Sequence, residues 1–600
     1  MTDESFTADQ VLARALAAAG GAAWARVRTL HVEGRMRAGG MSGPYEQWIA
    51  LERGRHALRF TLGPATMAGG YDGVRAWQRS ANGEVMVQDS EAALRAAATD
   101  AWINARGWWF ADRHPAAIDS LGRREADGLA FDVLQCVPAG GARIELWFDA
   151  SSHLLARIAA EVLGKPSLKR LDDYREVDGL WLPFRTTSGS GDARFDRVVE
   201  IDSVAVDVDV PASTFEPDAQ RANDLVFVDG GRRARLPVDI ANNHVFVAVE
   251  LDGHPLRFIL DTGGVNLVTT DTAARLGLRS EGELEGRGPG EQSVSVGFTR
   301  VARLVIGGQV VLERQLLRVL PMPGFDEVEG VPFDGVLGTE LFRRLVVRIA
   351  YADAALELID PAAFEAPAAA HSLPLTFFGH FPGVNGDLDG ARGQFWLDTG
   401  NRGGLFLAGP FAQAHALADR YPASGSMTIG WGVGGGAEGR LARGGRLALG
   451  AVAIDGPVLR LPSEGGGVMA MRDVAGNVGG EILGRFDVTF DYGRQRVLLV
   501  PNDAHGTPFA ADRAGMWINR RGDDVTVKAV MSGGPADAAG LQVGDVLCDV
   551  DGEPAAHVTL SALRRRLCEW PAGQVVALRI ARDGASFDAA LELRDLIPAA

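Results

Sequence analysis

The sequence is poor in cysteine and in long apolar runs. Three cysteines occur among 600 residues, Cys136, Cys548 and Cys568, and the first lies far from the other two. This pattern excludes a disulfide framework and fits no zinc-ligand spacing. No apolar run approaches the ~18 residues that cross a bilayer, so we expect no membrane span.

Basic charge is also scarce. The chain has 60 Lys and Arg residues against 77 Asp and Glu residues, a formal net charge of −17. Such a chain repels phosphate backbones, so we expect no nucleic-acid partner. The first ten residues, MTDESFTADQ, are acidic where a signal peptide is basic. The sequence as written therefore predicts either a cytoplasmic protein or a mature chain whose signal has been removed.

Glycine, by contrast, is abundant. With 76 glycines and no collagen period, the chain has the many tight turns that a mainly β fold needs. Its 46% hydrophobic content can build real cores. At about 150 residues per domain, the length predicts several domains.

The first predicted domain covers residues 1–220 and opens with one helical pattern. Asp9 is the predicted N-cap, and Val11, Leu12 and Leu16 lie on the apolar face. Strand patterns follow, with two-residue hairpin turns predicted at Gly140-Gly141 and Asp178-Gly179. These features predict a curved antiparallel half-barrel that wraps around the helix.

Several segments of this domain resemble the LolA-like group of lipoprotein-sorting envelope proteins. They are YDG before Trp77, ELWFDASSHLLARI, DYREVDGLWLPFR and VDVPASTFEPD. The resemblance implies a periplasmic or cell-envelope location and a hydrophobic groove for an acyl chain or an apolar peptide. The alternative is a β scaffold domain without a ligand.

Residues 222 to 502 contain an internal repeat. In each copy an Asp-Gly turn, at Asp252 or Asp389, lies nine residues before an Asp-Thr-Gly that starts at Asp261 or Asp398. The copies also end alike, in apolar-apolar-Gly triplets that we pair as Val336-Leu337-Gly338 and Ile482-Leu483-Gly484. The repeat predicts two homologous lobes, 221–365 and 366–504, joined by a Pro- and Ala-rich link at 361–370.

The two in-register Asp-Thr-Gly motifs resemble those of retropepsin-like and pepsin-like aspartic proteases. The resemblance implies a two-lobed β-barrel fold in which both loops meet at a pseudo-twofold axis. It makes Asp261 and Asp398 the catalytic pair of an endopeptidase that hydrolyses peptide or protein substrates. The supporting loop residues it implies are Thr262, Gly263, Thr399 and Gly400.

Two adjacent carboxyl groups suit this chemistry because they cannot both ionise, so one acts as a base and the other as an acid. The sequence contains neither His-Glu-x-x-His nor Gly-x-Ser-x-Gly. We therefore expect no metal and no other cofactor.

Two features bear on whether the repeat is active. Gly-rich segments at 285–297 and 425–439, the second with Trp431 as an apolar tip, are candidate flaps over the cleft, or simply long surface hairpins. The residue after Asp-Thr-Gly is usually small in these families, whereas here it is Gly264 or Asn401. With Arg402 behind it, Asn401 is expected to bring a polar group and a cation near one carboxylate.

The alternative function is a catalytically inactive envelope protein that binds peptides or lipoproteins through the half-barrel and the C-terminal domain.

The last predicted domain, 512–600, resembles a PDZ domain, with GGPADAAGLQVGDVLCDVDG as its most specific segment. The resemblance implies that the backbone of the loop and strand captures protein C-termini by strand addition. The residues concerned are Gly515, Met516, Trp517 and Ile518. The alternative is that this domain only packs against its neighbour.

Overall fold

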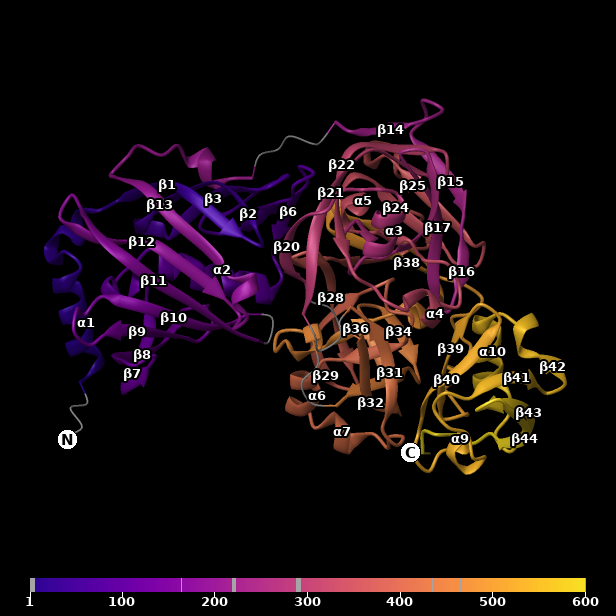
Figure 1. Cartoon of the computed structure of the whole chain (residues 1–600). Helices are drawn as coiled ribbons and strands as arrows, with labels where there is room; N and C mark the ends of the chain where they lie inside the picture. Colours follow the sequence, from indigo (N-terminus) through magenta and orange to yellow (C-terminus); the bar gives the residue numbers. More distant parts are fainter. Residues whose placement is uncertain are drawn as a thin grey trace.

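The computed structural model describes residues 6–162, 165–217, 223–286, 293–433, 435–463 and 467–598. Its five β-sheets confirm the mainly β fold class. In the described part of the chain, no helix is both long enough and apolar enough to span a membrane. Figure 1 shows the N-terminal domain beside the two central lobes and the C-terminal domain below the first lobe, next to the second lobe.

A 13-stranded antiparallel sheet forms the N-terminal domain and curves around two helices, α1 (Ala8–Ala18) and α2 (Glu91–Asn104) (Figure 1). Its strand order is β6-β5-β4-β3-β2-β1-β13-β12-β11-β10-β9-β8-β7. The strands are β1 (Thr29–Ala38), β2 (Met41–Ala50), β3 (Arg55–Leu62), β4 (Ala65–Tyr71), β5 (Ala76–Arg79), β6 (Val85–Gln88), β7 (Ala116–Ala126), β8 (Leu129–Pro138), β9 (Ile144–Asp149), β10 (Leu155–Val162), β11 (Lys165–Val177), β12 (Leu180–Gly189) and β13 (Arg197–Val206).

Two local predictions in this domain need correction. The N-cap of α1 is Thr7, not Asp9, because Thr7 and Gln10 form a capping box in which each side chain satisfies the other's backbone N–H. The turn at Asp178-Gly179 has the predicted two residues, with both φ angles positive. The turn at Gly140 does not, because the last β8–β9 pair is Cys136 with Ile144 and the connection is longer.

Each central lobe has its own sheet. In the first lobe the order is β14-β22-β19-β23-β18-β17-β21-β20, and β16 pairs with β17. The elements of this lobe are β14 (Leu225–Phe227), β16 (Asp239–Ala241), β17 (His244–Leu251), β18 (His254–Leu260), β19 (Leu267–Thr269), α3 (Thr270–Arg275), β20 (Glu281–Gly286), β21 (Val294–Ile306), β22 (Val310–Leu320), α4 (Phe325–Glu329), β23 (Gly335–Leu337) and α5 (Thr339–Arg344).

The second lobe repeats this plan in the order β31-β32-β35-β30-β36-β29-β28-β33-β34, and β27 pairs with β28. Its elements are β27 (Thr376–Phe378), β28 (Phe381–Leu388), β29 (Ala391–Leu397), β30 (Leu405–Leu407), α6 (Gly409–Ala414), α7 (Leu417–Arg420), β31 (Met427–Gly432), β32 (Gly435–Arg443), β33 (Arg446–Leu449), β34 (Val452–Asp455), β35 (Val458–Pro462), β36 (Gly476–Val478) and α8 (Gly480–Leu483).

A shared six-stranded sheet joins the lobes, in the order β15-β25-β24-β37-β38-β26. The first lobe supplies β15 (Arg233–Pro237), β24 (Val346–Ala350) and β25 (Ala355–Ile359), and the second supplies β26 (His371–Pro374), β37 (Phe486–Asp491) and β38 (Arg496–Pro501). The central pair, β24 with β37, is antiparallel, and one continuous apolar core runs through both lobes. The predicted boundary at 365 lies between β25 and β26.

The triplet predicted at the end of the second repeat was misplaced. In the first lobe β23 runs parallel to β18, with Leu337 opposite Leu260. In the second lobe β36 takes this place beside β29, with Val478 opposite Leu397. The equivalent of Val336-Leu337-Gly338 is therefore Asn477-Val478-Gly479. The segment Ile482-Leu483-Gly484 lies at the end of α8 and only imitates the apolar-apolar-Gly pattern.

The C-terminal domain has a separate core and a sheet in the order β39-β40-β41-β43-β44, with β42 paired to β41. Strand β39 lies at the edge of this sheet. The elements are β39 (Met516–Arg521), β40 (Asp524–Val530), α9 (Pro535–Ala538), β41 (Val546–Val550), β42 (Glu553–Pro554), α10 (Leu560–Glu569), β43 (Val575–Arg582) and β44 (Ala585–Glu592).

Candidate active site

Asp261 and Asp398 each follow the last residue of a buried strand, β18 or β29. The N–H of Asp261 donates to the carbonyl of Leu337 at 2.9 Å, and the N–H of Asp398 donates to the carbonyl of Val478 at the same distance. The two aspartates therefore occupy equivalent places in the two lobes.

Thr262 and Thr399 tie the two loops together. Each threonine N–H donates to the hydroxyl of the other at 3.0 Å. The hydroxyl of Thr262 donates to the carbonyl of Leu397, and that of Thr399 donates to the carbonyl of Leu260, both at 2.7 Å. Both side chains are fully buried, at 0% exposure. Four reciprocal hydrogen bonds thus hold one Asp-Thr-Gly loop against the other.

Gly263 and Gly400 let the carboxyl groups approach across the lobe boundary. A Cβ at Gly263 would lie 2.8 Å from the Asp398 carboxyl, and a Cβ at Gly400 would lie 2.4 Å from the Asp261 carboxyl. The N–H of each glycine also donates to the aspartate of its own loop, at 2.7 Å to Asp261 and 2.9 Å to Asp398. Glycine is therefore required at both positions by space.

The Asp261 and Asp398 carboxyl groups lie close enough to share a hydrogen bond. Burial raises the pKa of Asp261 well above its ordinary value, and the charge of Asp398 and the hydrogen bond to it raise it further. Two carboxyl groups in such contact carry one proton between them, and here the environment favours the proton on Asp261.

The surroundings of the two aspartates differ at one equivalent position. On the second lobe, the Asn477 side-chain amide donates to Oδ2 of Asp398 at 2.5 Å. On the first lobe, the equivalent residue is Val336, which offers no donor. A hydrogen bond to a carboxylate favours its ionised form, so Asn477 distinguishes Asp398 as the acceptor of the pair. Asn477 was not among the predicted site residues because the triplets were paired wrongly.

The residues after the two motifs also have a physical explanation. A Cβ at Gly264 would lie 2.6 Å from Oδ2 of Asp261, so glycine fits there and a side chain does not. Asn401 reaches Asp398 only through Asn477: its amide donates to the Asn477 side-chain oxygen, and its own oxygen accepts from the N–H of Gly403. The expected cation is not at a carboxylate of the pair either, because Arg402 pairs with Glu329 at 3.1 Å.

Each lobe also sends a histidine to the glycine of the opposite loop. Nε2 of His244, at the start of β17, lies 2.9 Å from the carbonyl oxygen of Gly400. The half-buried ring of His380, in the turn before β28, hydrogen-bonds to the backbone of Gly263, and burial lowers its pKa to about 3. Neither histidine was among the predicted site residues, although His244 stands two residues before Phe246 and His380 stands directly before Phe381.

A cavity of about 250 Å³ lies between the lobes at the aspartate pair. Most of its walls are apolar, and the larger side chains include Leu320, Phe325, Phe333, Phe406, Trp431 and Met469. The cleft therefore suits an extended chain with apolar side chains.

Both candidate flap segments border this cavity, but 287–292 and 434 lie outside the described residues. In the second segment, β31 and β32 form a hairpin, and Trp431 near its tip lines the cleft with 40% of its surface exposed. Val433 at the tip packs against a first-lobe cluster that includes Phe325.

The outer domains contact the strands that lead into these segments. The N–H of Glu283 in β20 donates to the carbonyl of Gly39, and Met41 packs closely on Gly282. Gly425, just before β31, lies against Met531, which follows β40. Figure 1 shows β20 at the N-terminal domain and β31 near β40.

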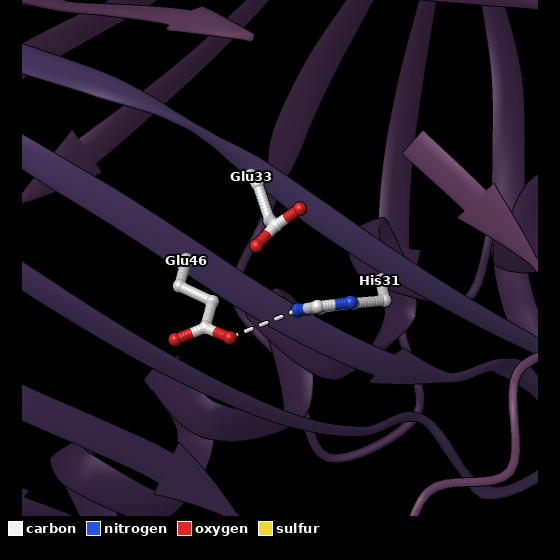
Figure 2. A group of neighbouring side chains, drawn as sticks. All are labelled: His31, Glu33 and Glu46. Atoms are coloured by element: carbon white, nitrogen blue, oxygen red, sulfur yellow. Dashed lines mark hydrogen bonds and ion pairs between the residues drawn. The ribbon is translucent and has the colours of Figure 1, made fainter. Parts of the chain in front are cut away.

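One cluster of metal-type donors lies elsewhere, in the N-terminal domain. His31 and Glu33 on β1 and Glu46 on β2 have ligand atoms within 4.8 Å of one another (Figure 2). His31 already pairs with Glu46 at 3.0 Å, and the Ser203 hydroxyl donates to Glu33 at 3.1 Å. These contacts explain the cluster as a set of cross-strand hydrogen bonds, and none of the predicted site residues belongs to it.

The predicted peptide-binding residues lie at the contact between the C-terminal domain and the lobes. Met516 and Ile518 are buried in the core of the C-terminal domain, and Gly515 has a positive φ of 67°. The ring of Trp517 faces the lobes, with the Arg402 guanidinium 4.5 Å from its centre. The structure thus brings Trp517 near the second aspartate loop.

Comparison with known families identifies two of the domains. A family described as aspartyl protease matches residues 247–341, which include Asp261, and a PDZ domain family matches residues 526–582. The chain thus contains an aspartyl protease domain and a PDZ domain, as predicted. No curated protein sequence matches the chain.

Several solved structures are similar to parts of the chain. The aspartic proteinase from Irpex lacteus is 14% identical, with 46% of this chain and 99% of that chain covered and a TM-score of 0.32. A LolA superfamily protein from Nitrosomonas europaea is 14% identical, with 35% and 98% covered and a TM-score of 0.26. A putative outer membrane lipoprotein-sorting protein domain from Vibrio parahaemolyticus is 9% identical, with 34% and 95% covered and a TM-score of 0.25.

Proposed function

We propose that this chain, which contains an aspartyl protease domain, is an aspartic endopeptidase whose water is activated between Asp261 and Asp398. The observation that carries the proposal is the reciprocal Thr262–Thr399 brace, which holds two carboxyl groups in hydrogen-bond contact at the floor of an apolar cleft. A binding protein without catalysis has no need for such a pair.

The different surroundings of the two aspartates assign their roles. Asp398 accepts a side-chain hydrogen bond from Asn477 that has no equivalent at Asp261, so we assign Asp398 as the base that takes a proton from the attacking water. Asp261 holds the shared proton and donates it to the oxygen of the scissile carbonyl. The water oxygen bonds to the carbonyl carbon to give a tetrahedral intermediate. This intermediate collapses when the leaving nitrogen takes the proton held by Asp398 and a hydroxyl of the intermediate returns its proton to Asp261, so the C–N bond breaks, the C=O bond re-forms and the pair regains its starting protonation.

The test of this proposal is cleavage of an unfolded protein and of a mixed peptide library, with the products identified by mass spectrometry. We expect internal cuts beside apolar side chains, because apolar groups line the cleft. Intact substrate after long incubation across the acid and neutral pH range would instead support the binding-protein alternative.

The pH dependence of cleavage follows from the raised pKa of Asp261. Activity needs the proton on Asp261, so kcat/KM falls as pH rises through the raised pKa, and the active range extends above that of an ordinary carboxyl group. The alkaline limb of a pH profile of kcat/KM measures this fall. An alkaline limb at the ordinary pKa of an aspartic acid would contradict the assignment of the proton to Asp261.

Asn477→Val, which copies the first-lobe residue Val336, tests the asymmetry of the pair. Without the Asn477 amide, Asp398 loses the donor that fixes its orientation, so kcat should fall about tenfold while KM stays nearly unchanged. Val336→Ile is the matched control, because it changes the equivalent position without touching a hydrogen bond. A kcat for Asn477→Val equal to that of Val336→Ile would show that Asn477 has no part in positioning Asp398.

A further inference from the structure

The edge of the PDZ domain that an added peptide strand would use is in contact with the first lobe. Helix α4 packs beside β39, and its Glu327 pairs with Arg521 of β39 and with Lys528 of β40. Gly330, which directly follows α4, lies so close to α10 that a Cβ on it would be 2.6 Å from Cβ of Leu560. Figure 1 shows α4 beside β39 and α10.

A second segment of the first lobe, the turn before β17, contacts α10. The N–H of Asn242 donates to the hydroxyl of Ser561 at 3.0 Å, and Arg564 donates to the Asn242 side-chain oxygen at 3.2 Å. Arg564 also donates to the carbonyl of Ile518 in β39 at 2.6 Å. A backbone acceptor on the edge strand is therefore already used.

The loop that would hold a peptide carboxylate already binds a carboxylate of this chain. The Asp512 side chain accepts from the N–H of Ala514 and from that of Gly515, both at 3.0 Å. Burial raises the pKa of Asp512 to about 6, so its carboxylate is ionised in most molecules at neutral pH. A substrate terminus at this loop must displace Asp512 as well as the first-lobe contacts.

The same contacts lead to the second aspartate loop. Glu329 at the end of α4 is 1% exposed and accepts from Nδ1 of His244 at 3.0 Å, while Nε2 of His244 lies 2.9 Å from the Gly400 carbonyl. Both partners of His244 are acceptors, so both hydrogen bonds form together only when the ring is an imidazolium. Burial alone would raise the pKa of Glu329, but His244 and Arg402 outweigh it and lower that pKa to about 2.

The PDZ side of this network is aromatic. The Trp517 ring has the Arg402 guanidinium 4.5 Å from its centre and the Arg564 guanidinium at 5.6 Å. Arg402 follows Gly400 and Asn401 in the second loop, so Trp517 contacts the loop of Asp398 directly through Arg402. Both are cation–π contacts, in which the ring face attracts the guanidinium charge.

We infer that β39 and α10 of the PDZ domain bind the first lobe of their own chain, and that this contact positions the Asp398 loop through Glu329, His244 and Arg402. The PDZ domain is then a positioning element of the active site and not an open receptor for substrate C-termini. The inference rests on the proposed peptidase function for its effect on turnover, but not for its effect on structure.

Peptide binding to the full chain tests the first half of the inference. We expect a labelled peptide with an apolar C-terminal residue to bind equally weakly as the free acid and as the amide. Glu327→Lys places a third cation beside Arg521 and Lys528 and weakens the α4 contact, so it should tighten binding of the free acid at least tenfold. Adding Arg521→Glu should reverse this gain. Two results together would overturn the inference. The wild type would bind the free acid at least tenfold more tightly than the amide, and it would bind the free acid at least as tightly as the Glu327→Lys variant does.

Arg564→Ala tests the second half, with Arg565→Ala on the exposed side of the same helix as the matched control. A misplaced Asp398 loop lowers kcat by about tenfold to 100-fold and leaves KM nearly unchanged. Amide hydrogen exchange at 400–404 should become faster in Arg564→Ala, while exchange at 262–264 stays the same. Glu329→Gln, which keeps the side-chain shape, should give the same pattern.

The hydrogen-exchange measurement distinguishes a failure of the proposed peptidase function from a failure of the positioning contact. If the chain cleaves nothing, the proposed function is wrong, but faster exchange at 400–404 in Arg564→Ala would still support the positioning contact. If Arg564→Ala and Glu329→Gln match Arg565→Ala in both kcat and exchange, the positioning role is overturned whether or not the chain is a peptidase.

Discussion

Asp261→Asn and Asp398→Asn should each lower kcat/KM for peptide cleavage by at least about 10³-fold, and the double variant should be no worse than either single one. General acid and general base contributions are each typically 10² to 10⁴. They are not additive here because the two carboxyl groups share one proton and act as a unit. Cleavage rates of purified variants on one fluorogenic peptide measure the effect.

Asp252→Asn is the matched control for these variants. Asp252 lies in the turn at the other end of β18, has a positive φ that asparagine also tolerates, and accepts from the N–H of Arg303 at 2.7 Å. We expect its activity to stay within twofold of wild type. A dyad variant that keeps more than a tenth of the wild-type rate would rule out the shared-proton mechanism.

Asp261→Asn should also make the protein more stable at neutral pH. The pKa of Asp261 is raised in the folded state, so above its unfolded value of about 3.9 the folded state binds more protons than the unfolded one. The stability of the wild type therefore falls as pH rises from the unfolded pKa to the raised folded pKa of Asp261, whereas asparagine has no proton to lose. Thermal unfolding at mildly acidic and at neutral pH measures the difference, and a lower Tm for Asp261→Asn at neutral pH would contradict it.

The parts of the site that sequence could predict are those fixed by the repeat. Asp261 and Asp398 come at the same distance after an Asp-Gly turn, so their equivalence is visible without a structure. The surrounding groups are not visible in this way, because Asn477 reaches Asp398 through strand register and His380 reaches the backbone of Gly263 from a turn. One misread triplet was enough to hide Asn477, since Ile482-Leu483-Gly484 repeats the apolar pattern only five residues further along.

The PDZ loop shows a second limit of sequence reasoning. Gly515 to Ile518 were predicted to capture a peptide terminus, and the local backbone has the geometry that favours an anion. What the pattern could not show is that Asp512, three residues earlier, already supplies the carboxylate, or that α4 comes from a lobe almost 200 residues away. Both depend on how domains pack, which a local motif does not encode.

Thr262→Val and Thr399→Val should each destabilise the two-lobed unit by about 2 to 6 kcal/mol. Each substitution keeps the shape of the side chain but leaves one buried N–H and one buried carbonyl without a partner, at about 1 to 3 kcal/mol for each group. This is a large share of the 5 to 15 kcal/mol that typically stabilises a folded domain. Thermal unfolding and amide exchange at positions 262 and 399 measure the loss.

Serine is the control at both positions, because it keeps the hydroxyl and removes only a methyl group, at about 1 kcal/mol. Activity should follow the hydroxyl as well, since the brace holds the carboxyl groups in contact: the valine variants should lose most of their kcat and the serine variants little. The double valine variant should lose less stability than the two single variants lose in total, because breaking one half of the brace already releases the other half. If valine and serine proved equally stable and equally active, the hydroxyl brace would not be what holds Asp261 against Asp398.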